Sequence, residues 1–196
     1  MSKAAATRMA ILQKAFELIY VHGYQATSID HIIATTKVTK GAFFYHFKSK
    51  DEMGLAVINE VMLPAMNGAM VQPLSSSVDP VHDIYALLHH LLLENSFLQV
   101  RYGCPAGNLT QEMSPVNDAF SAALSQLVTA WQHMIVQSID NGIKAGKIRP
   151  ATNGLQVAYF VMSGYWGIRS FGKLYNSNDC YHAWLRELKT YLHNLQ

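Results

Sequence analysis

The chain is poor in cysteine and in charge, and it lacks a long apolar run. Two cysteines among 196 residues cannot build a disulfide framework, which favours a reducing compartment. No apolar run approaches the roughly 20 residues that span a bilayer, and the segment before Ile11 is too short and polar for a signal peptide. Half of the residues are hydrophobic, enough for a substantial core. We therefore expect a cytoplasmic protein with no membrane partner.

Signatures of catalysis, cofactor binding and metal binding are also missing. We find no glycine-rich phosphate loop or dinucleotide fingerprint. None of the nine histidines pairs with cysteine at the spacing of a zinc site. His89 and His90 are adjacent, so they point to different faces of a helix and cannot easily chelate one ion. The sequence thus predicts no catalytic residue, no metal and no cofactor, and a protein that is not an enzyme.

Residues 27–50 are the most informative stretch that is present. Thr27 and Asp30 have the spacing of a capping box, and isoleucines follow at helical intervals. Thr39 suits the N-cap of a second short helix, in which Phe43 faces inward. The pattern favours two short helices joined by a tight turn, the layout of a helix-turn-helix whose second helix enters a DNA major groove.

Charge supports this interpretation over its plain alternative, a helical hairpin with an aromatic core. Residues 1–50 carry seven basic and two acidic side chains, a net charge of +5. Residues 51–196 carry eight basic and eleven acidic side chains, a net charge of −3. A basic first quarter on a mildly acidic body is typical of a protein that reads a polyanion.

Residues about 6–60 resemble the DNA-binding domain of the tetracycline-repressor (TetR) family. The family pattern is a first helix ending in Gly, then T-[ST]-x-x-x-I, a turn with V-[ST]-K-G, and an aromatic cluster ending in F-x-[SN]-K. The matching positions here are Gly23, Thr27, Ser28, Ile32, Val38, Thr39, Lys40, Gly41, Phe43, Phe47, Ser49 and Lys50. The resemblance implies that the chain is a transcriptional regulator, most often a repressor.

The resemblance also assigns the DNA contacts. It implies that the phosphate backbone is met by Thr27, Ser28, Phe44, Tyr45 and Lys50. It places nearest the base edges Thr39, Lys40, Gly41, Ala42 and His46.

Three positions depart from the family pattern. Lys37 replaces the usual turn glycine, where a left-handed backbone would cost about 1 kcal/mol. Ala42 replaces threonine and offers a thymine only a methyl group. Phe44 replaces tyrosine and loses a phenolic contact to phosphate. These departures bear on base preference rather than on DNA binding itself.

The expected fold is all-α, because helical patterns run almost end to end. We divide the chain into a helix-turn-helix domain at 1–50 (the motif at about 28–47), a connector helix and linker at 51–78, and an effector-sensing and dimerisation domain at 79–196. The connector starts at Ser49 and is expected to kink at Pro64. Residues 103–108 are expected to break the pattern before a short helix at 109–113. Later helices are expected to start at Pro80, at Ser114-Pro115, near 152 and near 179.

The last two expected helices are unusually apolar. Alone, this pattern is compatible with an ordinary core. In the TetR family the two helices form the four-helix bundle of the dimer, and the small Gly164 and Gly167 would permit close helix approach. A single small helix-turn-helix also needs a second copy to read a two-fold site. We therefore predict a homodimer that binds double-stranded DNA.

Two kinds of signal could control such a regulator. Aromatic and soft side chains on the middle helices could line a pocket for an apolar small molecule, although a simple core explains them equally well. These effector candidates are Tyr85, His89, Trp131, Tyr159, Met162 and Trp166.

The second signal is chemical. Residues 103–109, G-C-x-x-G-N-L, resemble a TetR subgroup of NemR-type repressors, in which the cysteine is associated with sensing electrophiles or oxidants. A helix starting just after Cys104 would lower the thiol pKa, and Lys173 is a candidate partner for an oxidised sulfur. The alternative is a buried cysteine acting as a small hydrophobe.

The leading hypothesis is a repressor released from its operator by an effector or by modification of Cys104, with the connector helix transmitting the change. One rival is an enzyme with Cys104 as nucleophile, but no motif places a histidine partner beside it. The other rival is a helical ligand-binding protein with a vestigial helix-turn-helix.

Overall fold

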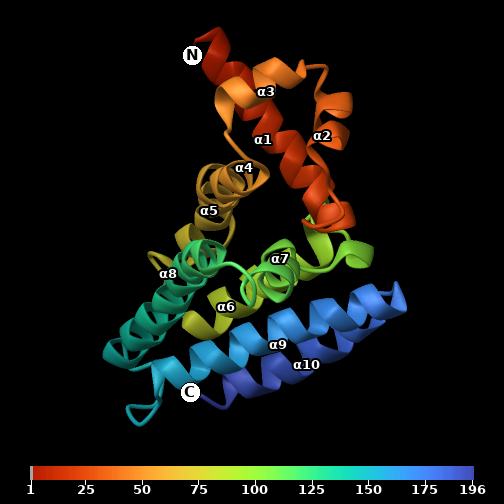
Figure 1. Cartoon of the computed structure of the whole chain (residues 1–196). Coiled ribbons are helices and arrows are strands. Elements are labelled where there is room, and N and C mark those ends of the chain that lie inside the picture. The colour runs from red at the N-terminus through yellow and green to blue at the C-terminus, as the bar shows by residue number, and fades with distance from the viewer. Residues whose placement is uncertain (1) are drawn as a thin grey trace. The chain divides into compact units, whose positions relative to one another are not determined.

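The computed structural model describes residues 2–196, and all the regular secondary structure in that range is helical (Figure 1). The α-helices are α1 (Lys3–His22), α2 (Ile29–Thr36), α3 (Lys40–His46), α4 (Lys50–Val57), α5 (Leu63–Met66), α6 (Pro80–His89), α7 (Pro105–Met113), α8 (Asp118–Lys144), α9 (Gly154–Tyr175) and α10 (Asp179–His193). Short 3₁₀ and π segments, η1 to η5, join several of them. The predicted all-α class is confirmed.

The chain forms two compact units. Unit 1 comprises the residues up to Ala65 together with Pro105–Gln126, and unit 2 comprises Met66–Cys104 together with Leu127–Gln196. Unit 1 therefore combines α1 to α4 with α7 and the beginning of α8. The division of the sequence at residues 50 and 78 remains a prediction.

The short helices of unit 1 begin at hydroxyl side chains. Ser28 Oγ accepts a hydrogen bond from His31 N at 3.1 Å, and Thr39 Oγ1 accepts one from Ala42 N at 3.1 Å. Ser49 Oγ does the same for Glu52 N at 3.0 Å. Each bond satisfies an amide that has no partner within its helix. The sequence placed two of these caps correctly.

The cap of α2 differs from the prediction by one residue. Thr27 is fully buried, and its hydroxyl donates to the carbonyl of Gly23 at 2.7 Å. Ser28 is exposed, so its hydroxyl can reach the amides of the first turn. Both residues are good N-caps, and burial of the first leaves the role to the second.

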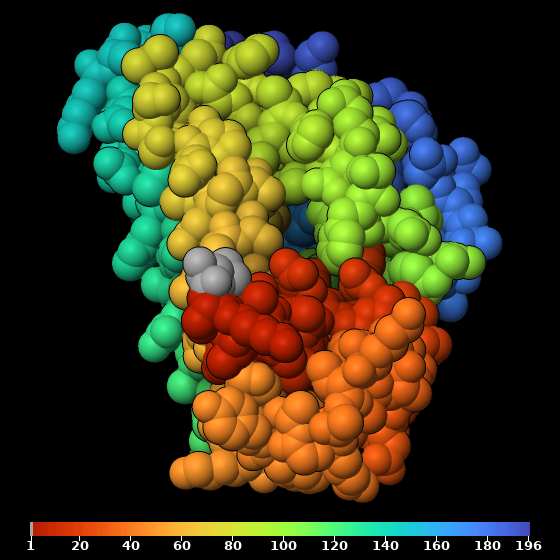
Figure 2. Space-filling view, turned by 90° about the horizontal axis from the view of Figure 1, so that it is seen from above, coloured from red at the N-terminus to blue at the C-terminus, as the bar shows by residue number. Residues whose placement is uncertain are grey.

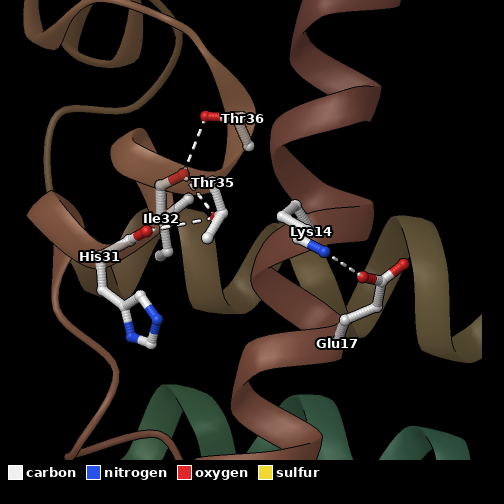
Figure 3. Close-up of polar contacts among 6 residues, drawn as sticks. All are labelled: Lys14, Glu17, His31, Ile32, Thr35 and Thr36. Carbon is white, nitrogen blue, oxygen red and sulfur yellow. Dashed lines mark hydrogen bonds and ion pairs between the residues drawn. The ribbon is translucent and has the colours of Figure 1, made fainter.

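The far end of α2 is closed by its own side chains, as Figure 3 shows. Thr35 Oγ1 donates to the carbonyl of Ile32 at 2.9 Å, and Thr36 Oγ1 donates to the same carbonyl at 2.8 Å. Lys37 follows with φ 58° and ψ 21°, the left-handed conformation expected where the family has glycine. The hydrogen bonds of Thr35 and Thr36 therefore hold the end of α2, although Lys37 has a side chain where the left-handed turn favours glycine.

The core of unit 1 is built from α1, α2, α3 and α4. Its fully buried side chains are Ile11, Leu12, Ala15, Ile32, Phe43, Met53 and Val57. Phe43 on α3 and Phe47, the residue that follows the helix, lie with ring centroids 5.6 Å apart, as their four-residue spacing predicts. This core leaves the opposite face of α3 to solvent.

Helix α4 opens a long helical run, Lys50–Leu74. By length and mean hydropathy (1.3) this run could cross a bilayer, which corrects the expectation that no apolar stretch approaches that limit. Met53, Val57 and Ile58 in the first part of the run are fully buried, and α4 packs against α1. The run continues through Pro64, with the π-type turn η1 (Ile58–Met62) just before it.

Helices α7 and α8 start elsewhere than the sequence predicted. Helix α7 begins at Pro105, so Gly107 and Asn108 are helical rather than part of a break. Proline suits a first helical position because its missing amide needs no partner there. Helix α8 begins at Asp118 rather than at Ser114, because Asn117 Oδ1 accepts from Ala119 N at 3.1 Å and caps it.

Gly54 marks a close approach within unit 1. A Cβ at this position would lie 2.6 Å from the ring of Phe120 on α8 and 2.7 Å from the ring of Tyr24. Those two rings lie edge to face, with centroids 5.0 Å apart. The absence of a side chain at residue 54 therefore allows α4 to pack tightly against both.

Unit 2 contains α6, α9, α10 and most of α8. Helix α10 packs against both α6 and α9, and Figure 1 shows α9 and α10 running side by side. Its largest buried side chains include Trp131, Tyr165 and Tyr181. Arg169 on α9 is also fully buried, which is rare for a charged residue.

Candidate nucleic-acid interface and sensor site

Helix α3 presents a polar and aromatic face to solvent. Lys40 and Gly41 are exposed, and Tyr45 is 78% exposed. Phe44 is also exposed, with its ring edge to face with buried Phe43. No side chain crowds Gly41, since a Cβ there would meet only Thr39 Oγ1 at 4.0 Å. A rigid backbone can therefore closely approach a ligand along this face.

The other α3 candidates lie at the edges of this face. Thr39 is exposed at the N-cap, whereas Ala42 and His46 are half-buried. Ser28 is exposed at the start of α2, but Thr27 is buried. In Figure 2 the surfaces of α2, α3 and the loop between them form one continuous area. Of the predicted DNA contacts, Ser28, Thr39, Lys40, Gly41, Phe44 and Tyr45 are thus exposed, whereas Thr27 is buried and Ala42, His46 and Lys50 are half-buried; their contact with DNA remains a prediction.

The two lysines of the predicted interface have different surroundings. Lys40 Nζ lies 3.1 Å from Asp30 Oδ1, and both side chains are exposed, so this pair is weak and easily exchanged. Lys50 instead turns toward the protein, with Nζ 3.3 Å from the Gln25 carbonyl and 4.4 Å from the Tyr24 ring centroid. Burial lowers the pKa of Lys50 below its usual value, against the field of Glu112. Its contact with phosphate remains a prediction.

Glu112, on α7, holds the turn before α2. Its carboxylate accepts hydrogen bonds from Tyr24 N at 2.8 Å and from Gln25 N at 2.6 Å. Two charge-assisted bonds to adjacent amides lock the loop that enters the helix-turn-helix. These residues are 88 and 87 positions apart in the sequence, so no local pattern could have identified the contact.

Tyr24 joins the same region to α4 and α8. Its hydroxyl donates to Asp51 Oδ1 at 2.6 Å, and Asn117 Nδ2 donates to Asp51 Oδ2 at 3.2 Å. Burial, followed by the bond to Asp51, raises the pKa of Tyr24 well above its usual value, so the phenol stays protonated. The turn after α1 is therefore tied to three other helices of unit 1.

Cys104 is buried, at 9% exposure, and directly precedes the first residue of α7. Arg169 lies beside this segment, because its Nη2 donates to the carbonyl of Gly103 at 2.7 Å. The same guanidinium donates to the carbonyls of Leu98 at 3.2 Å and Leu91 at 3.3 Å. A cation or a helix N-terminus near a thiol favours the thiolate, whereas burial, as at Cys104, disfavours it. Sequence reasoning missed Arg169, which lies 66 positions from Gly103.

Lys173 and Cys180 lie near the same end of α9. Lys173 is exposed, four residues after Arg169, so it lies one helical turn further along the same face. Cys180 is half-buried on α10, and burial raises its thiol pKa above the usual value. Cys104 is the more buried of the two thiols, so burial does not separate their roles, and the structural role of Cys180 and the sensor role of Cys104 remain predictions.

The six effector candidates do not gather in one cavity. Tyr85 and His89 line a groove of about 630 Å³ between α6 and α10. Trp131 and Met162 are buried in the core, where Trp131 meets Tyr165 edge to face at 5.5 Å. Tyr159 is exposed on α9 and Trp166 is half-buried there. Their spacing could not reveal this, because helical periodicity does not distinguish a core from a pocket wall.

Helix α9 has an exposed apolar face. Its exposed large side chains are Leu155, Tyr159, Phe160, Phe171, Leu174 and Tyr175. The Phe160 ring packs on Tyr191 of α10 with centroids 4.0 Å apart, which extends the face onto the neighbouring helix. A Cβ at Gly164 would meet Trp184 of α10 at 2.7 Å, whereas one at Gly167 would meet nothing within 4 Å. Such a face is typical of a protein interaction site.

Within residues 2–196, no group of three or more histidine, cysteine or acidic side chains is arranged to hold a metal ion.

Comparisons with known proteins match both the N-terminal and the C-terminal part of the chain to the same family. The model for bacterial regulatory proteins of the tetR family matches residues 11–57, and the model for a tetracyclin repressor-like C-terminal domain matches residues 82–188. An uncharacterized HTH-type transcriptional regulator in the lacX 3′ region of Lactococcus lactis subsp. lactis is 31% identical over 76% of this chain and 77% of its own.

Solved structures share the fold. A TetR-family transcriptional regulator from Cytophaga hutchinsonii superposes with a TM-score of 0.90 at 19% identity, covering 100% of this chain and 98% of its own. The reduced form of Escherichia coli NemR superposes with a TM-score of 0.81 at 21% identity, covering 96% of each chain. At these identities the likeness concerns the arrangement of helices alone.

Proposed function

Because the chain belongs to the TetR family of bacterial regulatory proteins, we propose that it is a cytoplasmic repressor that binds a pseudo-palindromic operator as a homodimer. The observation that carries this proposal is the exposed face of α3. Lys40, Gly41 and Tyr45 point to solvent from a helix whose other face is locked by Phe43 in the core. A rigid helix with such a face suits insertion into a major groove.

The dimer would form through the apolar face of α9 and its extension onto α10. Burying this face in a second copy would remove large aromatic side chains from water, at about 25 cal/mol per Å² of apolar area. A two-fold axis there would present two α3 helices to successive major grooves, roughly 34 Å apart. The spacing of the two half-sites in the operator would follow from this geometry.

Lys40→Ala tests the DNA interface. We expect affinity for the DNA adjoining its own gene to fall about tenfold or more, because a major-groove contact is lost. Gel shifts at several salt concentrations measure the effect, and the thermal midpoint should not change, because Lys40 is exposed. Lys144→Ala, which removes an exposed lysine at the end of α8, is the matched control. Equal loss of affinity in both variants, or equal weak binding to every DNA sequence, would contradict the proposal.

We further propose that Cys104 releases the repressor when it is modified, as the NemR-like motif implies. Arg169 binds the carbonyl of Gly103, the residue before Cys104, and α7 begins just after it; a cation and a helix N-terminus close to the sulfur would favour a reactive thiolate. The thiolate would add across the double bond of N-ethylmaleimide, and the resulting carbanion would take a proton from water. Because the site is buried, the added group would displace the start of α7.

Cys104→Ser separates this proposal from DNA binding itself. The variant should bind the operator like the parent protein but should no longer be released by N-ethylmaleimide or hypochlorite. Cys180→Ser serves as the control and should retain release. Release that is unchanged in Cys104→Ser would end the sensor hypothesis and leave the DNA-binding proposal intact. Lys173→Met tests the proposed pairing with an oxidised sulfur, and should alter recovery after hypochlorite but not the reaction with maleimide.

Two routes could carry the change to the helix-turn-helix. The connector that starts at α4 is the route expected from the sequence. The second is α7, whose first residue follows Cys104 and whose Glu112 holds the amides of Tyr24 and Gln25. A shift of α7 along its axis would therefore act directly on the turn that enters α2.

A further inference from the structure

The groove between α6 and α10 belongs to unit 2 alone. It has a volume of about 630 Å³, within the range of pockets that bind drug-sized molecules. Its floor includes the buried side chains of Val81 and Leu192, and the half-buried ring of Tyr85 forms part of its wall. The groove therefore offers both apolar surface and an aromatic face.

The two carboxylates that line the groove are already paired. Asp79 Oδ2 lies 3.2 Å from Lys147 Nζ, and its Oδ1 accepts from His82 N at 3.2 Å as the cap of α6. Glu94 contacts two imidazoles, with His89 Nδ1 and His90 Nδ1 each 3.0 Å from one of its oxygens. These contacts lower the pKa of Asp79 and of Glu94 below their usual values. Asp79 is therefore paired with an ammonium, whereas Glu94 is balanced by a positive charge only where His89 or His90 is protonated.

Lys189 also lines the groove, and it differs from Asp79 in having no ion-pair partner in the part of the chain that the structure describes. Within residues 2–196 no carboxylate lies within ion-pair distance of its ammonium. The ammonium instead lies 5.7 Å from the ring centroid of Tyr85, at the outer limit of a cation–π contact. Lys189 therefore gives the groove an ammonium that no carboxylate of the described residues contacts.

Flat surfaces lie next to this charge. The rings of Tyr85 and His89 are one helical turn apart on α6, with centroids separated by 6.0 Å and planes inclined by 40°. His193 Nδ1 lies 2.8 Å from the carbonyl of Lys189, so Nε2 is the ring nitrogen not used in that bond. A ligand whose anionic group pairs with Lys189 could therefore pack a planar ring against Tyr85 and form a hydrogen bond with His193 Nε2.

We propose that this groove binds a small organic anion with a planar, aromatic body. The carboxylate of the ligand pairs with Lys189, and its ring packs against Tyr85 and His89. The groove uses the opposite side of α10 from the Tyr191 contact that extends the apolar face of α9. Binding itself is independent of DNA recognition. Only its consequence, a change in operator affinity, rests on the proposed function.

Benzoate tests the site, with benzamide as a neutral probe of the same shape and benzylamine as a cationic one. Ligand-observed NMR titration of the full-length protein should show saturable binding of benzoate and much weaker binding of the other two. Lys189→Met should weaken benzoate binding at least tenfold, and Tyr85→Leu should weaken it severalfold. Lys144→Met removes an exposed lysine outside the groove and should leave binding unchanged.

Several results would overturn the proposal. Benzamide binding as tightly as benzoate would remove the role of charge, and equal benzoate binding by Lys189→Met and Lys144→Met would place the anion elsewhere. Absence of saturable benzoate binding would reject the site. Circular dichroism establishes that the variants are folded, as expected for an exposed lysine. A gel shift at saturating benzoate tests the consequence separately, and unchanged operator affinity would reject an effector role without affecting the binding site.

Discussion

The short helices of unit 1 and the long helices of unit 2 are held in different ways. In unit 1, α2, α3 and α4 each begin at a hydroxyl that bonds an amide three residues later. In unit 2, the most buried charge, Arg169, bonds carbonyls 66 to 78 positions away. The caps of unit 1 join residues that are close in the sequence, whereas the contacts of Arg169 join residues that come together only when the chain folds.

This difference matches the task proposed for each unit. A reading helix must keep the same orientation in every encounter with DNA, and local caps together with Phe43 in the core provide that rigidity. A sensing unit must change when a small group is added. In unit 2 a single guanidinium gathers three carbonyls around the segment that leads into Cys104, so one displaced bond affects several others.

Arg169→Leu should have the largest effect and sharpens the comparison. The substitution leaves carbonyls of residues 91, 98 and 103 without their shared donor, and each buried acceptor left unpaired costs about 1–3 kcal/mol. We expect the free energy of unfolding to fall by at least about 3 kcal/mol, measured by urea denaturation. Arg186→Leu, at an exposed site on α10, is the control. A loss no larger than that of the control would show that Arg169 is not a structural hub.

Glu112→Ala should have the next largest effect. It tests a place in unit 1 where a long-range contact, rather than a helix cap, holds backbone amides, those of Tyr24 and Gln25. We expect a loss of about 1–2 kcal/mol and faster hydrogen exchange of those two amides by NMR. Glu187→Ala, at an exposed site on α10, should change neither quantity. Unaltered exchange at residues 24 and 25 would rule out the clamp.

Lys37→Gly should have the smallest effect, and it stabilises the protein. Lys37 has φ 58°, a conformation that costs a residue with a side chain about 1 kcal/mol, and glycine removes this cost. Part of the gain is offset because glycine also raises the entropy of the unfolded chain. A net gain of about 0.5 kcal/mol should raise the melting temperature by about 1–2 °C in calorimetry. Lys37→Ala keeps the strained backbone and should bring no gain. A similar rise in both variants would attribute the effect to charge instead.

The sequence was sufficient wherever the determining residues were close together. The caps at Thr39 and Ser49 and the inward Phe43 could be predicted from spacing alone, whereas the left-handed turn at Lys37 was expected from the family resemblance. These features depend on amides and side chains within four residues of one another, so a linear pattern contains the relevant physics.

Where two neighbours could perform the same task, the sequence could not choose between them. Thr27 and Ser28 are both good caps for α2, and burial decided for Ser28. Ser114 and Asn117 competed in the same way at the start of α8, and Asn117 took the position. The partners of Arg169 and Glu112 lie more than sixty positions away, beyond any local pattern.

The close packing around Gly54 limits which amino acids this position can accept. Its missing side chain leaves room for the rings of Tyr24 and Phe120, which would lie within 3 Å of any Cβ. In a library with every codon at this position randomised, selection for a folded product should return glycine almost alone. The same experiment at Gly167, where nothing lies within 4 Å in this chain, should accept alanine and serine as long as the protein is monomeric. Comparing the two libraries with and without selection for self-association would reveal whether a second copy occupies that space.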